Sequence, residues 1–301
     1  MARTVGRATG KAILAGEHFV VHGMPALAVP VPGGVLEAEL DEAGAGPAPA
    51  GHVRACLDVL HRQCGGPAPD TLAVQVRSSL PPGAGLGSSA ALAVALGRAW
   101  AARTGRPRND DELRRASLAC ERIAHGNPSG IDTEVALTGR ALRFVRGAPP
   151  RNVAVAPGLG LIVVDTGTAR STRGMVEEVE RRRTEDPAAF ERRGTQVREL
   201  VEAIEGALAT GDLPTLGAAF DATQRVLADL GVSTPEIDRA AAALRRAGAA
   251  GAKLTGKGGG GAVIAPCRAA DLDAITGRLQ AAGWRVALAG ALTAAEREGG
   301  R

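Results

Sequence analysis

The chain has 301 residues, 45% of them hydrophobic, and a formal net charge of +4. This length and composition allow one large core or two medium ones. The small net charge argues against a nucleic-acid partner, because nucleic-acid-binding surfaces gather basic residues on one face, and aromatic residues make up only 2% of the chain.

The cysteines and the apolar segments indicate the cellular compartment of the protein. Cys56, Cys64, Cys120 and Cys267 are scattered and lack the spacing of a disulfide framework, which is typical of reduced thiols in a cytoplasm. The first residues lack the apolar stretch of a signal peptide, and no apolar run is long enough to cross a bilayer. We therefore predict a cytoplasmic protein without a membrane partner.

The first strong pattern along the chain is a strand that ends in polar residues. Residues 4–8 read as a strand, and Lys11 precedes an apolar run that ends in Gly16-Glu17-His18. Such a strand places polar groups at the mouth of a cleft. On its own, Lys11 also fits a charge on an edge strand, and His18 fits a loop residue. The apolar pattern of residues 26–31 predicts a further strand.

The segment 51–64 carries apolar residues at helical spacing and predicts an amphipathic helix. His52, Cys56, His61 and Cys64 lie in the same segment and are residue types that bind zinc. The amphipathic helix is the simpler account of these residues.

A glycine-rich loop, Pro81 to Ala91, follows a predicted strand at 72–77 and opens into a predicted helix at 88–100. Glycine allows close backbone approach, and the free N–H groups and dipole of a helix start favour a phosphate. The spacing matches neither a Walker A loop nor a dinucleotide fingerprint. Ser88 or Ser89 could cap the helix, and one hydroxyl could reach a phosphate-bound Mg²⁺. The loop alone leaves a tight turn with a serine cap equally open.

Two carboxylates follow in sequence. A helix is predicted from Asn109 onwards, and it carries Glu121 near its C-terminal end, where a carboxylate opposes the helix dipole and invites a cation. A second glycine turn, residues 125–132, opens a short helix with Pro128 in a first-turn position. Asp132 either faces what the loop encloses or serves as a carboxylate at a helix start.

The pattern of the second half of the chain predicts strands and long helices, and a loop at 147–150 suggests a domain boundary near residue 150.

A third glycine-rich turn, Lys253 to Gly261, has four consecutive glycines, which predicts close backbone approach to a ligand or a flexible hairpin. The run Arg181-Arg182-Arg183 is bracketed by glutamates and predicts a solvated helix face. The predicted helices cover 173–183, 187–209, 213–230, 235–247 and 269–282, with strands at 159–165, 254, 262–265 and 284–289.

Three glycine motifs in this order resemble the GHMP kinase superfamily and, within it, the mevalonate kinases. The motifs are Lys11 to Pro25, Pro81 to Ala91 and Lys253 to Gly261. Glu121 followed by His125 to Asp132 is the stretch that most separates mevalonate kinases from their relatives. The resemblance covers nearly the whole chain, and the joint specificity of the motifs is high.

The resemblance implies a mixed α/β (α+β) GHMP kinase fold. Its N-terminal domain, residues 1–150, would contain a left-handed βαβ unit, and its C-terminal domain, residues 151–301, would be ferredoxin-like. Ligands would bind in the cleft between them. The implied activity is ATP-dependent, Mg²⁺-requiring phosphorylation of the 5-hydroxyl of mevalonate in isoprenoid precursor synthesis. The oligomeric state stays open, a homodimer included, because the family is often dimeric.

The family's site residues carry over to matching positions of this chain. Asp132 and Lys11 match the catalytic pair and also substrate-binding positions, together with Glu17 and His18. Ser89 with Glu121 would hold Mg²⁺. The ATP phosphates would contact Gly83, Ala84, Gly85, Leu86, Gly87, Ser88, Ser89, Gly258 and Gly259.

The residues leave some points open. Lys11 would lower the pKa of Asp132 and of a substrate hydroxyl alike, so Asp132 either takes the proton or orients the hydroxyl. Lys257 stands where mevalonate kinases usually carry Ala, and Ala124 replaces a bulkier apolar residue. The alternatives are a GHMP kinase that acts on phosphomevalonate, galactose or homoserine, and a non-catalytic GHMP-fold sensor. The full set of catalytic and metal residues argues against a sensor.

Overall fold

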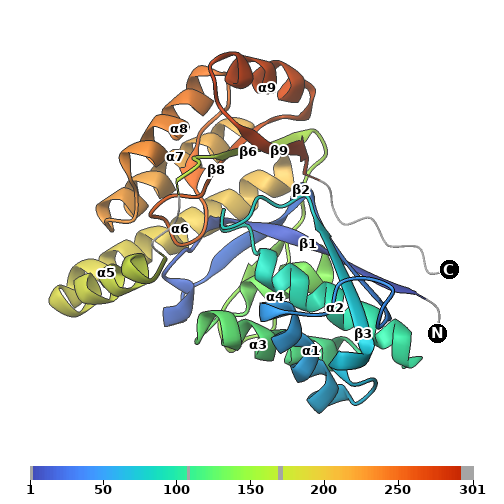
Figure 1. The fold of residues 1–301 in the computed structure, drawn as a ribbon. Coiled ribbons are helices and arrows are strands. Elements are labelled where there is room, and N and C mark those ends of the chain that lie inside the picture. Colours follow the sequence, from blue (N-terminus) through green and yellow to red (C-terminus); the bar gives the residue numbers. More distant parts are fainter. Residues whose placement is uncertain (1–2, 107–108, 169–171, 293–301) are drawn as a thin grey trace. The chain divides into compact units, whose positions relative to one another are not determined.

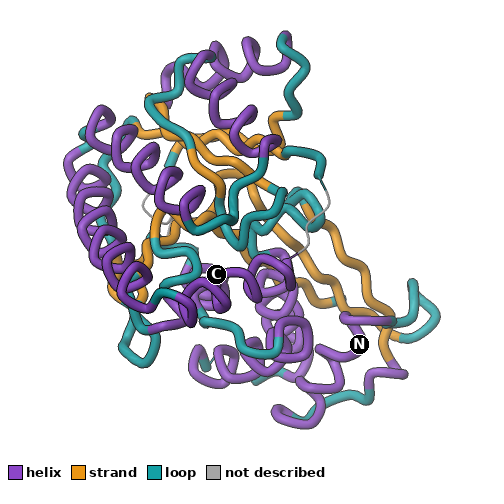
Figure 2. The backbone as a smooth tube through the Cα atoms, turned by 90° about the vertical axis from the view of Figure 1, so that its left-hand side faces the viewer, coloured by secondary structure: helices purple, strands orange, loops and turns teal. Residues whose placement is uncertain are grey.

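The computed structural model describes residues 3–106, 109–168 and 172–292, in which helices and strands are mixed throughout (Figures 1 and 2). This confirms the predicted α/β class. The chain packs as two compact units, and each is built from separate segments. Unit 1 comprises Met1–Lys11, Gly34–Leu80 and Gly87–Gly139, and unit 2 comprises Ala12–Gly33, Pro81–Leu86 and Arg140–Arg301. The predicted boundary near residue 150 separates two family domains, whereas the two units above are defined by packing. The boundary therefore stays a prediction.

Strands β1 and β2 each contribute residues to both units. In unit 1 the second half of β2 pairs antiparallel with β3, with Leu36 opposite Ser78. This pairing carries β2 well past the predicted end of the strand at Val31. The elements with residues in unit 1 are β1 (Thr4–Ala15), β2 (Ala26–Glu42), α1 (Gly51–Cys64), β3 (Leu72–Ser78), α2 (Ser88–Thr104), α3 (Asp110–His125) and α4 (Ile131–Thr138).

In unit 1, α2 contacts α1, α3 and α4, and α3 also contacts α1 and α4. Nearly every residue of α2 from Ala90 to Trp100 is buried, as predicted for a helix without a polar face. Trp100 lies in this core and donates its Nε1–H to the Gly65 carbonyl at 2.9 Å. The hydrogen bond satisfies the indole N–H and ties α2 to the end of α1. The amphipathic helix predicted at 51–64 is confirmed as α1.

Unit 2 contains a four-stranded antiparallel sheet in the order β7-β8-β6-β9, against which α7, α8 and α9 pack (Figure 1). Its inner strand β6 covers the predicted residues 159–165 and is apolar and almost wholly buried. In addition, β2 pairs with β4. The remaining elements are β4 (Leu142–Phe144), β5 (Arg151–Asn152), β6 (Leu159–Asp165), α5 (Thr172–Glu185), α6 (Pro187–Thr210), α7 (Leu213–Asp229), α8 (Pro235–Arg246), β7 (Lys253–Leu254), β8 (Ala262–Arg268), α9 (Leu272–Ala281) and β9 (Val286–Ala291).

Three helices of unit 2 begin where local side chains satisfy the free N–H groups of the first turn. Asp186 caps α6, Asp212 caps α7 and Thr234 caps α8, each by accepting a backbone hydrogen bond, and each helix has a proline in its first two positions. These starts lie within one residue of the predicted ones. In the part of the chain that the structure describes, no helix combines the length and apolar character needed to cross a membrane.

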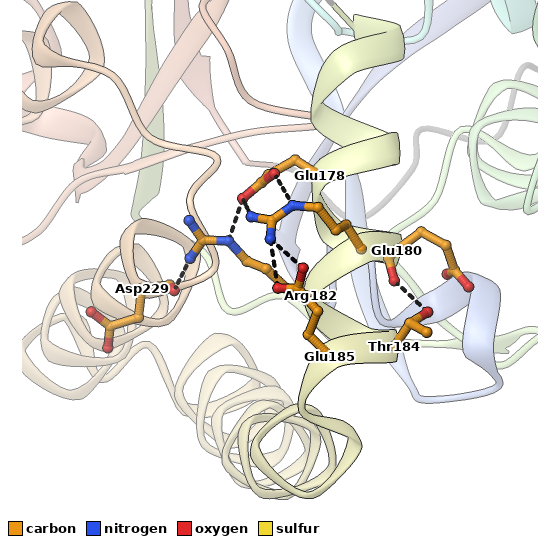
Figure 3. Close-up of polar contacts among 7 residues, drawn as sticks. Glu178, Glu180, Arg182, Thr184, Glu185 and Asp229 are labelled. Carbon is orange, nitrogen blue, oxygen red and sulfur yellow. Dashed lines mark hydrogen bonds and ion pairs between the residues drawn. The ribbon is translucent and has the colours of Figure 1, made fainter.

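The arginine run of α5 differs from the predicted solvated face at one position. Arg181 and Arg183 contact glutamates of their own helix. Arg182 also bonds to a glutamate of α5, since its Nε–H donates to Glu178 at 2.6 Å, and in addition it donates to the Asp229 carbonyl at 3.0 Å, at the end of α7 (Figure 3). Its guanidinium also lies against Gly231, where a Cβ atom would be 2.6 Å from Nη2. Arg182 therefore joins α5 to the turn that follows α7.

This contact predicts unequal effects of neighbouring substitutions in α5. We expect Arg182→Ala to lower the free energy of unfolding by about 1 kcal/mol, because a hydrogen bond from a charged donor to a backbone carbonyl is lost. Arg181→Ala is the matched control and should be nearly neutral, since exposed ion pairs within one helix contribute little. Urea denaturation of both variants measures the difference. Equal effects would contradict the assigned role of Arg182.

Candidate active site

Lys11 and Asp132 form an ion pair in unit 1. Lys11 belongs to β1 and Asp132 to the first turn of α4, and Nζ lies 3.4 Å from Oδ1. The Lys11 side chain is buried, whereas 32% of the Asp132 side chain is exposed. Asp132 therefore keeps one face open to a reactant while Lys11 holds it from the other side.

The glycine loop ends directly beside this ion pair. Gly87 has a φ of 73°, and a Cβ atom there would be 3.0 Å from Cγ of Lys11 and 3.6 Å from Oδ2 of Asp132. The left-handed backbone and the close approach both require glycine. The structure thus brings the predicted catalytic pair and the end of the predicted phosphate loop together.

The predicted serine cap of α2 is wrong. Helix α2 begins at Ser88, its N-cap is Gly87, and no side chain caps the first turn. Oγ of Ser89 lies 3.3 Å from Nε2 of His52, and the Ser89 hydroxyl lies close enough to Glu121 to lower the pKa of that carboxyl. The hydroxyl is therefore directed to groups on other helices rather than to its own backbone.

Glu121 is a buried carboxylate. Its burial raises its pKa to about 7, an effect that the Ser89 hydroxyl opposes and the charge of Asp132 reinforces. Within the described residues its Oε1 atom has no hydrogen-bond partner. A buried carboxylate oxygen without a partner is unfavourable, and a cation would relieve it.

The donor set at Ser89 and Glu121 fits Mg²⁺. A hydroxyl and a carboxylate are hard oxygen ligands, and Mg²⁺ commonly combines one or two such groups with phosphate oxygens and water. The described residues contain no cluster of three or more His, Cys, Asp and Glu side chains that could hold a metal ion. They therefore give no support to a zinc site at His52, Cys56, His61 and Cys64.

In unit 2, residues of the third glycine motif form hydrogen bonds with the end of β1. Lys253 is fully buried and donates to the Glu17 carboxylate, to the Ile13 carbonyl at 3.0 Å and to the Leu254 carbonyl at 2.6 Å. The Thr255 hydroxyl accepts from the Ile13 N–H at 2.8 Å. Because Glu17 is buried against Lys253, a contact between Glu17 and substrate stays a prediction.

His18 has an unusual backbone conformation. Its φ of 65° is the only positive value among non-glycine residues in the described ranges. Its Nε2–H donates to the Lys257 carbonyl at 3.1 Å. A left-handed non-glycine residue is uncommon and persists where the surroundings hold it, often at functional sites. The contact also links the first motif to Lys257, the residue that departs from the family pattern.

The second and third glycine motifs also meet within unit 2. The Ala262 N–H donates to the Ala84 carbonyl at 3.1 Å, and the Gly259 N–H donates to the Val232 carbonyl at 2.9 Å. Gly258 has a φ of 74°, and a Cβ atom there would lie 2.2 Å from the Val232 carbonyl oxygen, which explains the need for glycine. Ala84 is buried, as is Leu86, so this part of the loop could offer a ligand its backbone but not these side chains.

Comparison with known proteins places the chain in a family. The models of the N-terminal and the C-terminal domain of GHMP kinases match residues 51–140 and 199–284. The mevalonate kinase of Aeropyrum pernix is 36% identical over 287 residues, which span 85% of this chain and 86% of that protein. The chain belongs to the GHMP kinase family. The mevalonate kinase of Thermococcus onnurineus is 30% identical and covers 87% of this GHMP kinase.

Solved structures confirm the GHMP kinase fold. The crystal structure of L. major mevalonate kinase in complex with R-mevalonate has a TM-score of 0.81 and 28% identity, covering 93% of this chain and 92% of that one. Mevalonate kinase from methicillin-resistant Staphylococcus aureus has a TM-score of 0.71 and 26% identity over 97% of this chain. This GHMP kinase is therefore a phosphotransferase that uses ATP.

The structure also shows what the sequence motifs missed. Helix α4 begins at Ile131 after Gly130, so Pro128 precedes the helix instead of lying in its first turn. The spacing of four residues placed His52 and Cys56 on one face of the predicted helix, but no sequence signal indicated the contact of His52 with Ser89. Nothing local to Lys253 indicates its buried pairing with Glu17.

Proposed function

We propose that this GHMP kinase transfers the γ-phosphoryl group of ATP to the 5-hydroxyl of mevalonate, producing 5-phosphomevalonate and ADP in isoprenoid precursor synthesis. The observation that carries the proposal is the Lys11–Asp132 ion pair beside Gly87, where the glycine loop ends. It is supported by relatives named mevalonate kinase, one of which was crystallised with R-mevalonate.

The residues of this site suit phosphoryl transfer, which depends on positioning and charge neutralisation more than on covalent help. Asp132 would accept the hydrogen bond or the proton of the 5-hydroxyl, and Lys11 would stabilise negative charge that develops on its oxygen. Backbone N–H groups of the loop from Gly83 to Ser89 and of Gly258 would bind the ATP phosphates. Gly259 would line the same site without donating its N–H, which bonds to the Val232 carbonyl. Ser89 and Glu121 would hold Mg²⁺. The bound ion would neutralise charge on the phosphates.

The proposal is tested by ADP release with ATP and Mg²⁺ against mevalonate, phosphomevalonate, galactose and homoserine. We expect turnover on mevalonate alone. Turnover on another of these acceptors would assign the protein to that branch of the family. ATP binding without turnover on any of them would favour the non-catalytic sensor and overturn the proposal.

The metal site carries a separate prediction. Glu121→Gln keeps the shape of the side chain and removes its charge, so the Mg²⁺ concentration for half-maximal activity should rise at least about tenfold, since even outer-shell partners of a metal contribute that much. Glu112→Gln, on the same helix, is the control. A Mg²⁺ titration measures both variants, and an unchanged curve for Glu121→Gln would assign the metal to other ligands.

We further propose that the protein works in the cytoplasm. All four cysteines are free, and Cys56, Cys120 and Cys267 are buried, which suits a reducing compartment. A homodimer stays a prediction from the resemblance, and light scattering of the purified protein would test it.

A further inference from the structure

His52 is the residue of α1 that contacts the proposed metal site. It lies in the first turn of α1 and is half-buried. Its Nε2 atom is 3.3 Å from Oγ of Ser89. The same Ser89 hydroxyl is near enough to the Glu121 carboxyl to lower its pKa. Side chains from three helices, α1, α2 and α3, thus converge on one hydroxyl group.

The ring of His52 is held in place by the packing beneath it. Sγ of Cys56, one turn further along α1, lies 3.6 Å from the same Nε2 atom. Cys56 is completely buried, and its carbonyl lies 3.8 Å from Sγ of Cys120 on α3. Since α1 packs against both α2 and α3, the position of His52 relative to Ser89 is set by the helix core.

The Ser89 hydroxyl has a single proton to share between its two neighbours, His52 and Glu121. Ser89 has one proton and two lone pairs, so it donates to only one of its two neighbours at a time. A cation shared by Ser89 and Glu121 needs a lone pair of Ser89 on the side of Glu121. The proton must then turn away from Glu121, and Nε2 of His52 lies in reach to accept it when the imidazole is neutral and carries its proton on Nδ1.

We propose that His52 is a positioning residue for the metal site, which acts by accepting the Ser89 hydroxyl proton so that an oxygen lone pair faces the cation. The proposal rests on the proposed function insofar as Ser89 and Glu121 bind Mg²⁺. Partners of this kind orient the direct ligands of a metal, and their loss typically weakens metal binding by about 10- to 100-fold.

Nucleotide binding tests the proposal without turnover. Calorimetry gives the Kd of the non-hydrolysable analogue AMP-PNP with Mg²⁺ and with EDTA, and the ratio of the two values measures the gain from the metal. In His52→Ala this gain should fall by about tenfold or more, with the Kd in EDTA unchanged. His52→Gln, whose amide can accept the same hydrogen bond, should retain most of the gain.

Two controls separate positioning from a structural effect. His61→Ala alters another histidine of α1, near the end of the helix, and should bind like the wild type. In a Ser89→Ala background, His52→Ala should cause no further loss, because a residue that acts through Ser89 has nothing left to position. If His52→Ala alone lowers the thermal midpoint of unfolding, the comparison within the Ser89→Ala background still tests the proposal.

Three results would overturn the proposal. The first is a Mg²⁺-dependent gain in affinity in His52→Ala equal to that of the wild type, and the second is a His52→Gln variant as impaired as His52→Ala. The third is a loss caused by His52→Ala that is equally large in the wild-type and the Ser89→Ala backgrounds. None of these measurements involves mevalonate. A wild type that fails to phosphorylate mevalonate but shows the His52 effect would overturn the proposed acceptor and leave the role of His52 standing.

Discussion

Asp132→Asn should lower kcat with mevalonate by roughly 10²- to 10⁴-fold, the range that a positioned acid or base contributes. Asparagine preserves the shape of the side chain but carries no charge and cannot take a proton. Lys11, 3.4 Å away in the native protein, would then lack its anionic partner, so the charge balance beside the hydroxyl changes as well. Both effects act on the reacting oxygen.

Steady-state kinetics measures this effect, and calorimetry with AMP-PNP should show nucleotide binding close to that of the wild type. Asp111→Asn is a suitable control, because Asp111 is exposed on α3 and pairs only with Arg114 among the ion pairs of the described residues. A near-normal kcat in Asp132→Asn would remove Asp132 from the mechanism. A raised KM at unchanged kcat would limit its role to substrate binding.

Lys253→Met should lower the free energy of unfolding by about 3–5 kcal/mol, as expected when one partner of a buried ion pair is removed. The substitution keeps the length of the side chain but leaves the Glu17 carboxylate buried without its cation. It also removes donors to the Ile13 and Leu254 carbonyls. The three losses act in the same place, where the glycine motif holds the end of β1.

Urea denaturation with Lys257→Met as the control measures this prediction, because Lys257 lies in the same glycine-rich turn and is only half-buried. The double variant with Glu17→Gln should recover part of the loss, since a neutral amide is easier to bury than an unpaired carboxylate. A decrease below about 1 kcal/mol in Lys253→Met would show that the buried pair contributes little beyond its desolvation cost.

Much of the fold and of the family assignment followed from local patterns. The starts of α6, α7 and α8 could be predicted because an Asp or Thr cap and a first-turn proline act within a few residues. The positions of Glu121 and Asp132 on their helices followed in the same way. The family was evident because its three glycine motifs occur in order.

Local patterns failed where a long-range contact decided the outcome. Ser88 and Ser89 are good capping residues by type, yet neither caps α2, and Oγ of Ser89 lies 3.3 Å from Nε2 of His52 on α1. Arg182 lies in a run that reads as solvated, yet it bonds to the Asp229 carbonyl. For Ser89 the contact with another helix replaces the local cap, whereas Arg182 keeps its bond to Glu178 in α5 and adds the contact with the end of α7.

The fold class, the family and the residue types of the candidate site can be read from the amino-acid sequence alone. Caps, glycine turns and apolar periodicity act over one or two turns of chain, so they are visible without a structure. Which groups are paired depends on how the helices and strands pack together. Lys253 and Glu17 are 236 positions apart, and packing alone could bury them together. The same holds for His52 and Ser89, because the contact depends on how α1 lies against α2.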